Sequence, residues 1–186
     1  MAINTQKLTV EAFWEQYAGQ PYELVNGEIM AMPPAGYEAA SIARRVAMYM
    51  GLFVDENDLG DVLAGDGGYK LDEITLRAPD ASFVSKEKLA GQSDRSKYLN
   101  MPPDLAVEVV SPNDSAGEVR QKVALYLEKG VKLVWVVYPS TRIVDVYGPD
   151  GAARPFKDGD TLSGGDVLPG FTLSVTAIFP VQETGS

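Results

Sequence analysis

Three acidic residues of this chain stand where their neighbours predict little contact with water. Asp80 follows a proline inside the extended apolar segment 77–84, and Glu108 lies among valines in DLAVEVVSP. Glu23 lies in an apolar run just before Asn26-Gly27. Ionised carboxylates avoid burial unless they are paired with a cation or bind a metal. The positions of the three acids therefore suggest a bound or paired cation.

Carboxylates on neighbouring strands suit a hard cation such as Mg²⁺, which prefers oxygen ligands. A cation held there would bind a phosphate oxygen and lower the pKa of a bound water. A lysine two residues after Glu108 would share its face of the strand, but Val110 occupies that position. The nearest candidate is Lys122, on the following predicted helix, where it would orient or deprotonate the water.

The composition excludes most other chemistry. The 186 residues include no cysteine and no histidine, which rules out thiolate nucleophiles, Cys- or His-ligated metals and an imidazole base. The net charge of −10 is unfavourable for a protein that binds phosphates without regard to sequence. No apolar run approaches the roughly 20 residues that cross a bilayer, and no secretion signal is evident, so we expect a cytoplasmic protein without membrane contact.

Local patterns predict the elements that must position these residues. Residues 8–17 indicate a helix with Thr9 as its N-cap, and Asn26-Gly27 predicts a hairpin that pairs Glu23 with Met30. A second helix is expected over 37–54. Short strands are expected near 62–64 and 70–76, followed by a long surface loop with a helical turn from 85 to 103.

The segment 104–112 is typical of a central strand covered on both faces, because only Glu108 interrupts its apolar side chains. Ser115 and Glu118 form a capping box, and Gly130 ends the helix that they begin. A second apolar strand over 131–137 completes a strand–helix–strand unit, which requires a parallel pair. Strands are also expected over 143–147 and 171–175. We expect an α/β fold in one domain over residues 1–186, with a core over about 20–138 and a β-rich extension over about 142–180.

Each candidate residue also has a structural interpretation. Asp80 could cap a turn or neutralise Arg77, and Glu108 could pair with a lysine in the core. Glu23 could be a solvated hairpin residue, and Lys122 a surface lysine whose stem packs on apolar neighbours. Two serines near the strand end, Ser111 and Ser115, have no base to activate them, so turn and cap roles are expected.

Several motifs together resemble the Uma-two family, a group of restriction-endonuclease-like proteins that is frequent in cyanobacteria. The resemblance covers about Leu8 to Phe179 and rests on YELVNGEIMAMPP, APDASFV, PPDLAVEVVSPNDS, KVALYLEKGVKLVWVVYP and GGDVLPGFTLSV, in that order. The family belongs to the PD-(D/E)xK nuclease superfamily. The resemblance therefore implies a restriction-endonuclease-like mixed sheet flanked by helices, an N-terminal hairpin and a homodimer.

The resemblance also assigns roles. It implies that Asp80 is the acid of the PD element, Glu108 the second acid and Lys122 a relocated lysine, with Glu23 the acid of the YELV-G motif. The backbone carbonyl of Val109 is implied as a further metal ligand. Two positions depart from the family pattern: Val110 replaces the usual lysine, and Ala39 stands where a histidine is frequent.

Three hypotheses follow. The first is a Mg²⁺-dependent endonuclease, with Mn²⁺ as a substitute, that hydrolyses DNA and leaves a 5′-phosphate; Glu23 would then support the site or belong to a second metal. The second is a non-catalytic member that binds nucleic acid or protein. In the third, the carboxylates only form an ion pair with Lys122. The ion pair predicts that Glu108→Gln destabilises the fold, whereas a site strained by repulsion predicts a neutral or stabilising effect.

Overall fold

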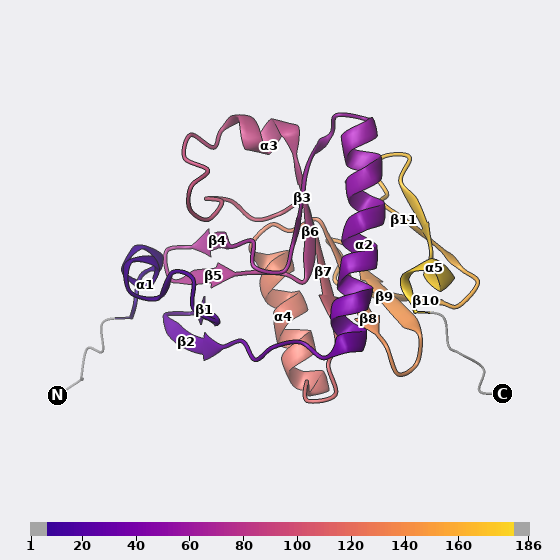
Figure 1. Cartoon of the computed structure of the whole chain (residues 1–186), viewed down its shortest axis with the longest axis horizontal. Helices are drawn as coiled ribbons and strands as arrows, with labels where there is room; N and C mark the ends of the chain where they lie inside the picture. Colours follow the sequence, from indigo (N-terminus) through magenta and orange to yellow (C-terminus); the bar gives the residue numbers. More distant parts are fainter. Residues whose placement is uncertain (1–6, 181–186) are drawn as a thin grey trace.

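The computed structural model describes residues 7–180. Its centre is a mixed six-stranded sheet in the order β10-β9-β8-β7-β6-β3 (Figure 1). These strands are β3 (Gly60–Ala64), β6 (Ala81–Ser85), β7 (Leu105–Val109), β8 (Leu133–Tyr138), β9 (Ile143–Tyr147) and β10 (Ala153–Lys157). Only β7 and β8 are parallel neighbours in this sheet of the described chain. The expected α/β class with a mixed sheet is confirmed.

The predicted strand–helix–strand unit is present. Helix α4 (Ala116–Glu128) connects β7 to β8, and both hydrogen bonds of the Ser115–Glu118 capping box form at its start. All five side chains of β7 are buried, as the nearly continuous apolar pattern predicts. The helix therefore begins just beyond the carboxyl end of β7, so its first turns lie close to Glu108.

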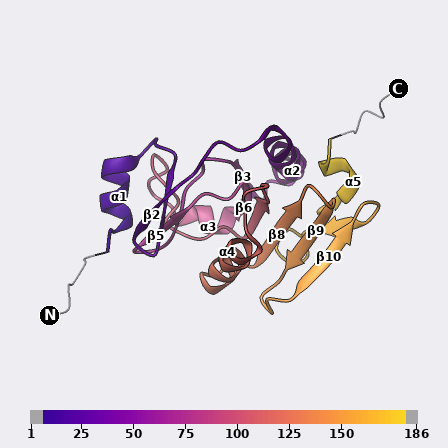
Figure 2. The same ribbon diagram turned by 90° about the horizontal axis from the view of Figure 1, so that it is seen from below.

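Two helices cover opposite faces of this sheet (Figure 2). Helix α2 (Tyr37–Glu56) packs on one face through buried apolar residues at helical spacing, including Ile42, Val46 and Met50. Helix α4 packs on the other face through Val119, Val123 and Tyr126. The covered sheet explains why the central strands have no polar face.

A second sheet holds the predicted hairpin. Its order is β2-β1-β5-β4, and its elements, with the preceding helix, are α1 (Val10–Tyr17), β1 (Tyr22–Val25), β2 (Glu28–Ala31), β4 (Tyr69–Asp72) and β5 (Thr75–Arg77). Glu23 pairs with Met30 as expected. Asn26 and Gly27 have φ of 52° and 82°, the positive values that a type I′ turn requires. Thr9 caps α1, also as expected.

The C-terminal part differs in detail from the prediction. The sequence did not predict β10 or β11 (Thr161–Ser163), which pair with β9 and with β12 (Thr172–Ser174). Pro155 argues against a strand in the sequence, because proline is compatible only with an edge strand. In the structure β10 is such an edge strand. The expected strand 171–175 ends early, because Val175 starts α5 (Val175–Ile178).

The long segment after β6 was expected to be a loop with a helical turn. It contains α3 (Lys86–Ala90), capped by Ser85. Among the helices of residues 7–180, none has the length and apolar character that a membrane span needs.

Candidate active site

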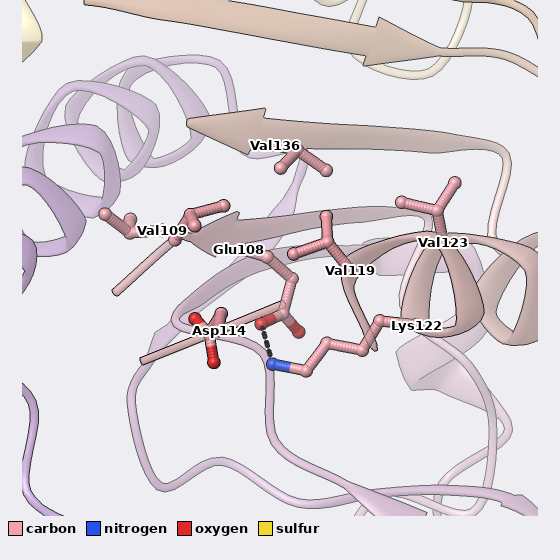
Figure 3. A pocket seen from close by; sticks show the side chains of 8 residues that line it. Glu108, Val109, Asp114, Val119, Lys122, Val123 and Val136 are labelled. Atoms are coloured by element: carbon pink, nitrogen blue, oxygen red, sulfur yellow. Dashed lines mark hydrogen bonds and ion pairs between the residues drawn. The ribbon is translucent and has the colours of Figure 1, made fainter. Parts of the chain in front are cut away.

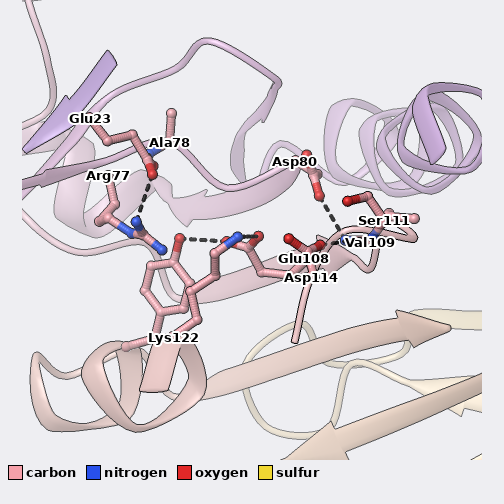
Figure 4. A network of polar contacts seen from close by, with 10 residues as sticks. Glu23, Arg77, Ala78, Asp80, Glu108, Val109, Ser111, Asp114 and Lys122 are labelled. Carbon is pink, nitrogen blue, oxygen red and sulfur yellow. Dashed lines mark hydrogen bonds and ion pairs between the residues drawn. The ribbon is translucent and has the colours of Figure 1, made fainter. Parts of the chain in front are cut away.

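The two acids of the predicted site lie beside each other in the central sheet, Asp80 immediately before β6 and Glu108 on the adjacent β7. The antiparallel register of β6 and β7 pairs Ala81 with Val107. Continued by one residue, this register places Asp80 opposite Glu108, and cross-strand neighbours share a face of the sheet. Figure 4 shows the two carboxylates on the same side of β7. The structure therefore brings Asp80 and Glu108 together.

Asp80 is held by the backbone of the neighbouring strand. Its Oδ2 accepts a hydrogen bond of 2.7 Å from the backbone N–H of Val109. Within residues 7–180, Asp80 forms no ion pair, and Arg77, considered as its partner, pairs with Glu23 instead. Burial, and then the charge of Glu108, raise the pKa of Asp80 to about 6, against the opposing effect of the Val109 hydrogen bond. The charge of Lys122 also acts to lower this pKa, but among the described residues no cation forms an ion pair with Asp80.

Glu108 is bound at both oxygens by residues of α4. Lys122 Nζ lies 2.8 Å from Oε2, and the hydroxyl of Tyr126 donates to Oε1 over 2.7 Å. Glu108 is only 7% exposed, so it requires such partners. The ion pair of the third hypothesis therefore exists, and it satisfies Glu108 but not Asp80.

Lys122 reaches Glu108 from helix α4. The sequence had made it the candidate lysine because Val110 occupies the position two residues after Glu108. Its side chain is 33% exposed, so the ammonium group meets solvent as well as Glu108. Burial would lower the pKa of Lys122, but the charge and hydrogen bond of Glu108 outweigh it and raise that pKa. The lysine is therefore held as a cation at the edge of the site.

A small hollow lies beside this ion pair (Figure 3). Its volume is about 10 Å³, room for roughly one water molecule. Its walls are Glu108, Val109, Val110, Asp114, Val119, Lys122, Val123 and Val136. Asp114, which the sequence did not single out, accepts from the backbone N–H of Ser111 and is exposed. The hollow is of the size of a water or an ion, so a larger substrate would lie outside it.

Glu23 lies in the same polar network but makes different contacts (Figure 4). Its Oε2 accepts from Arg77 Nη1 at 2.6 Å, and its Oε1 accepts from the backbone N–H of Ala78 at 2.7 Å. Glu23 is 8% exposed, so the interpretation as a solvated hairpin residue is wrong. Burial raises the pKa of Glu23, while Arg77 and then Ala78 act to lower it.

The resemblance implies a divalent cation at this site. Asp80 and Glu108 offer carboxylate oxygens, and Mg²⁺ binds commonly through one or two carboxylates with water and phosphate completing its shell. Among the described residues, no group of three or more Asp, Glu, His or Cys side chains is arranged to hold a metal. A two-carboxylate site completed by substrate is therefore the arrangement that these residues fit. The carbonyl of Val109 stays an expected ligand.

Ala39 and Val110, the two residues that differ from the family pattern, both have mainly apolar neighbours. Ala39, at the place where a histidine is frequent, lies in the first turn of α2 and is buried in the core. Val110 is partly buried and lines the hollow. The sequence missed the role of Tyr126, which it placed in an apolar stripe. The i, i+4 spacing to Lys122 was the available signal, because both residues face the same acid.

The chain has the α/β fold of a solved nuclease-like protein. The crystal structure of "a putative nuclease belonging to DUF820" from Anabaena variabilis matches with a TM-score of 0.79 and 17% identity, over 92% of this chain and 97% of that one. The model of the Uma2 family, described as "Putative restriction endonuclease", matches residues 10–176. The chain therefore belongs to the Uma2 family. A search of curated proteins gives no significant match.

Proposed function

We propose that this chain is a Mg²⁺-dependent endonuclease that hydrolyses phosphodiester bonds of DNA. The observation that carries the proposal is the pair of acids Asp80 and Glu108, which the continued register of β6 and β7 places opposite each other, with no ion pair formed by Asp80 within the described chain. Two carboxylates placed so close repel each other, and Asp80 also loses solvation by burial. A divalent cation between them would relieve both effects. The description of the Uma2 family supports the same chemistry.

The residues divide the work as follows. Asp80 and Glu108 would hold the cation, with the Val109 carbonyl as a further ligand. When bound, the cation supplies a water of lowered pKa and neutralises charge on the phosphate. Lys122 has three N–H donors, and only one is directed to Glu108, so the others can hydrogen-bond the attacking water or a phosphate oxygen. Attack of water on phosphorus breaks the bond to the 3′ oxygen and leaves a 5′-phosphate.

Cleavage of plasmid DNA tests this proposal directly. With Mg²⁺ or Mn²⁺ we expect nicked and linear products from the wild-type protein, and no products above background from Asp80→Ala. Asp61→Ala is the matched control, because Asp61 lies on the edge strand β3, is exposed, and should leave cleavage unchanged. Equal activity of Asp80→Ala and the wild type would contradict the proposal.

A non-catalytic binding protein is the second candidate, and the charges favour it. Ten of the sixteen Lys and Arg side chains lie in ion pairs within residues 7–180, which leaves few cations for phosphates. If this candidate is correct, Mn²⁺ should not raise the melting temperature. At a Mn²⁺ concentration 100 times its Kd, a metal site would add about 2.7 kcal/mol of stability. A clear thermal shift that Asp80→Ala abolishes would exclude it.

The proposal includes a homodimer, because cutting both strands of a duplex commonly requires two sites related by symmetry. Light scattering coupled to size-exclusion chromatography measures the mass directly. A mass near twice the 20.1 kDa of one chain is expected, and a mass of one chain would contradict this part of the proposal.

A further inference from the structure

Tyr126 contacts the acid of the candidate site from inside the protein. Its ring is fully buried, and its hydroxyl donates 2.7 Å to Glu108 Oε1. Tyr126 lies one helical turn after Lys122, so one helix supplies the partners of both Glu108 oxygens. A carboxylate with both oxygens bound from fixed directions has one orientation. Glu108 is therefore held in place before any cation or substrate arrives.

The opposite side of Tyr126 leads to the hairpin. Arg77 lies close enough to Tyr126 for its charge to oppose the rise in the pKa of Tyr126 that burial causes, and it donates a hydrogen bond of 2.6 Å to Glu23 Oε2. Glu23 Oε1 is taken by the backbone of Ala78. Arg77 and Glu23 are 7% and 8% exposed. Buried polar and charged groups thus extend from Glu23 on β1 through Arg77 on β5 and Tyr126 on α4 to Glu108 on β7, and charges act on one another strongly in such a buried network.

We propose that Tyr126 is a positioning residue for Glu108, and that the Glu23–Arg77 pair supports the site through its effect on Tyr126. This inference rests on the proposed function. Each carboxylate oxygen has two acceptor positions, so Oε1 can accept from Tyr126 and still face a cation. Glu23 differs in what stands opposite it: buried Arg77 neutralises it across the strands, whereas Glu108 faces the second acid Asp80, so a cation at Glu23 would not relieve repulsion between two facing acids. Glu23 therefore supports the site and is not a ligand of a second metal.

Metal affinity tests the role of Tyr126. Tyr126→Phe removes one oxygen and keeps the ring, so Mn²⁺ binding measured by calorimetry should weaken about 10- to 100-fold, as for other groups that orient a metal ligand. Tyr69→Phe is the matched control, because Tyr69 is also fully buried and its hydroxyl hydrogen-bonds Ser82, at 2.7 Å, away from the acids of the site. Unchanged affinity in Tyr126→Phe, or an equal loss in both variants, would overturn the inference. Glu23→Gln, which keeps Tyr126, should weaken Mn²⁺ binding by a smaller factor, and no change there would remove Glu23 from the network.

Melting of the metal-free protein tests the network without any assumption about activity. Substitutions of residues in one network change the stability non-additively. Tyr126→Phe should therefore lower the melting temperature less in a Glu23→Gln background than in the wild type. Tyr69→Phe should lower it equally in both backgrounds. Additive shifts for Tyr126→Phe would overturn the connection to Glu23. Failure of the wild type to bind Mn²⁺ would instead contradict the proposed function, so the two failures are distinguishable.

Discussion

Two of the cross-strand pairs place one charged residue opposite another, and they differ in the signs of the two charges. In the N-terminal sheet, Leu24 pairs with Leu76, and the continued register places Glu23 opposite Arg77. In the central sheet, the corresponding continuation places Asp80 opposite Glu108. The first pair joins opposite charges at 2.6 Å, whereas the second joins like charges. The first pair is complete by itself, and the second is not.

The presence or absence of a cationic partner separates acids with a structural role from an acid that is a candidate for function. Glu23 and Glu108 each have a cationic partner, Arg77 and Lys122, so each of these two acids is balanced locally. Asp80 is the acid of the network that stays unbalanced, and burial together with Glu108 raises its pKa to about 6. Groups whose pKa is displaced by burial and by a like charge are commonly found at functional sites. The uncompensated position is therefore the better candidate for metal binding, although all three acids are buried or partly buried.

The largest change in stability is expected when the ion pair between Glu23 and Arg77 is broken. Arg77→Met should lower the free energy of unfolding by about 3–5 kcal/mol, because it leaves the Glu23 charge buried with only the Ala78 hydrogen bond. Arg154→Met is the control: Arg154 pairs with Asp150 on the surface, where solvent screens the charges, and its loss should change the free energy of unfolding little. Urea unfolding measures both. A similar small cost for the two variants would show that the buried pair has no special role.

A smaller effect is expected at Glu108. Glu108→Gln should lower the metal-free stability by about 2 kcal/mol, because the amide can accept from only one of Lys122 and Tyr126 and presents a donor to the other. Glu128→Gln, at the exposed end of α4, should change little. A neutral or stabilised Glu108→Gln would mean that repulsion from Asp80 outweighs both contacts.

The smallest expected change in stability is an increase, and it is expected at Asp80. Asp80→Asn keeps an oxygen for the Val109 N–H and removes the strained charge, so at pH 8 it should stabilise the metal-free protein by about 1 kcal/mol. An upper bound is about 3 kcal/mol, since a change of one in a pKa corresponds to about 1.4 kcal/mol and the group is partly solvated. The folded-state pKa lies above the unfolded value of 3.8, so the wild type loses stability as the pH rises from about 4 through 6. The advantage of Asp80→Asn should accordingly vanish near pH 4 in thermal melts. Equal stability of the two proteins at pH 8 would show that Asp80 carries no strain.

Much of the fold was determined by local sequence. The Asn26-Gly27 turn fixes the register of its hairpin, because both positions need positive φ, and the Ser115–Glu118 box fixes the start of α4. The apolar runs on either side of α4 required a parallel pair. Strand β10 was not predictable in this way, because Pro155 is compatible with a strand only at the edge that the tertiary structure provides.

The site was determined only in part by the sequence. Asp80 and Glu108 could be singled out because a carboxylate among apolar residues is costly without a partner, and Lys122 because it is near in the chain. The tertiary structure decided which partner each acid has. Glu23 and Arg77 are 54 residues apart in the chain, and their contact depends on β1 pairing with β5, which no local pattern specifies. Hydrogen bonds between distant strands depend on register and packing of the whole sheet, and so the sequence identified the acids while the fold decided which of them is left without a cation.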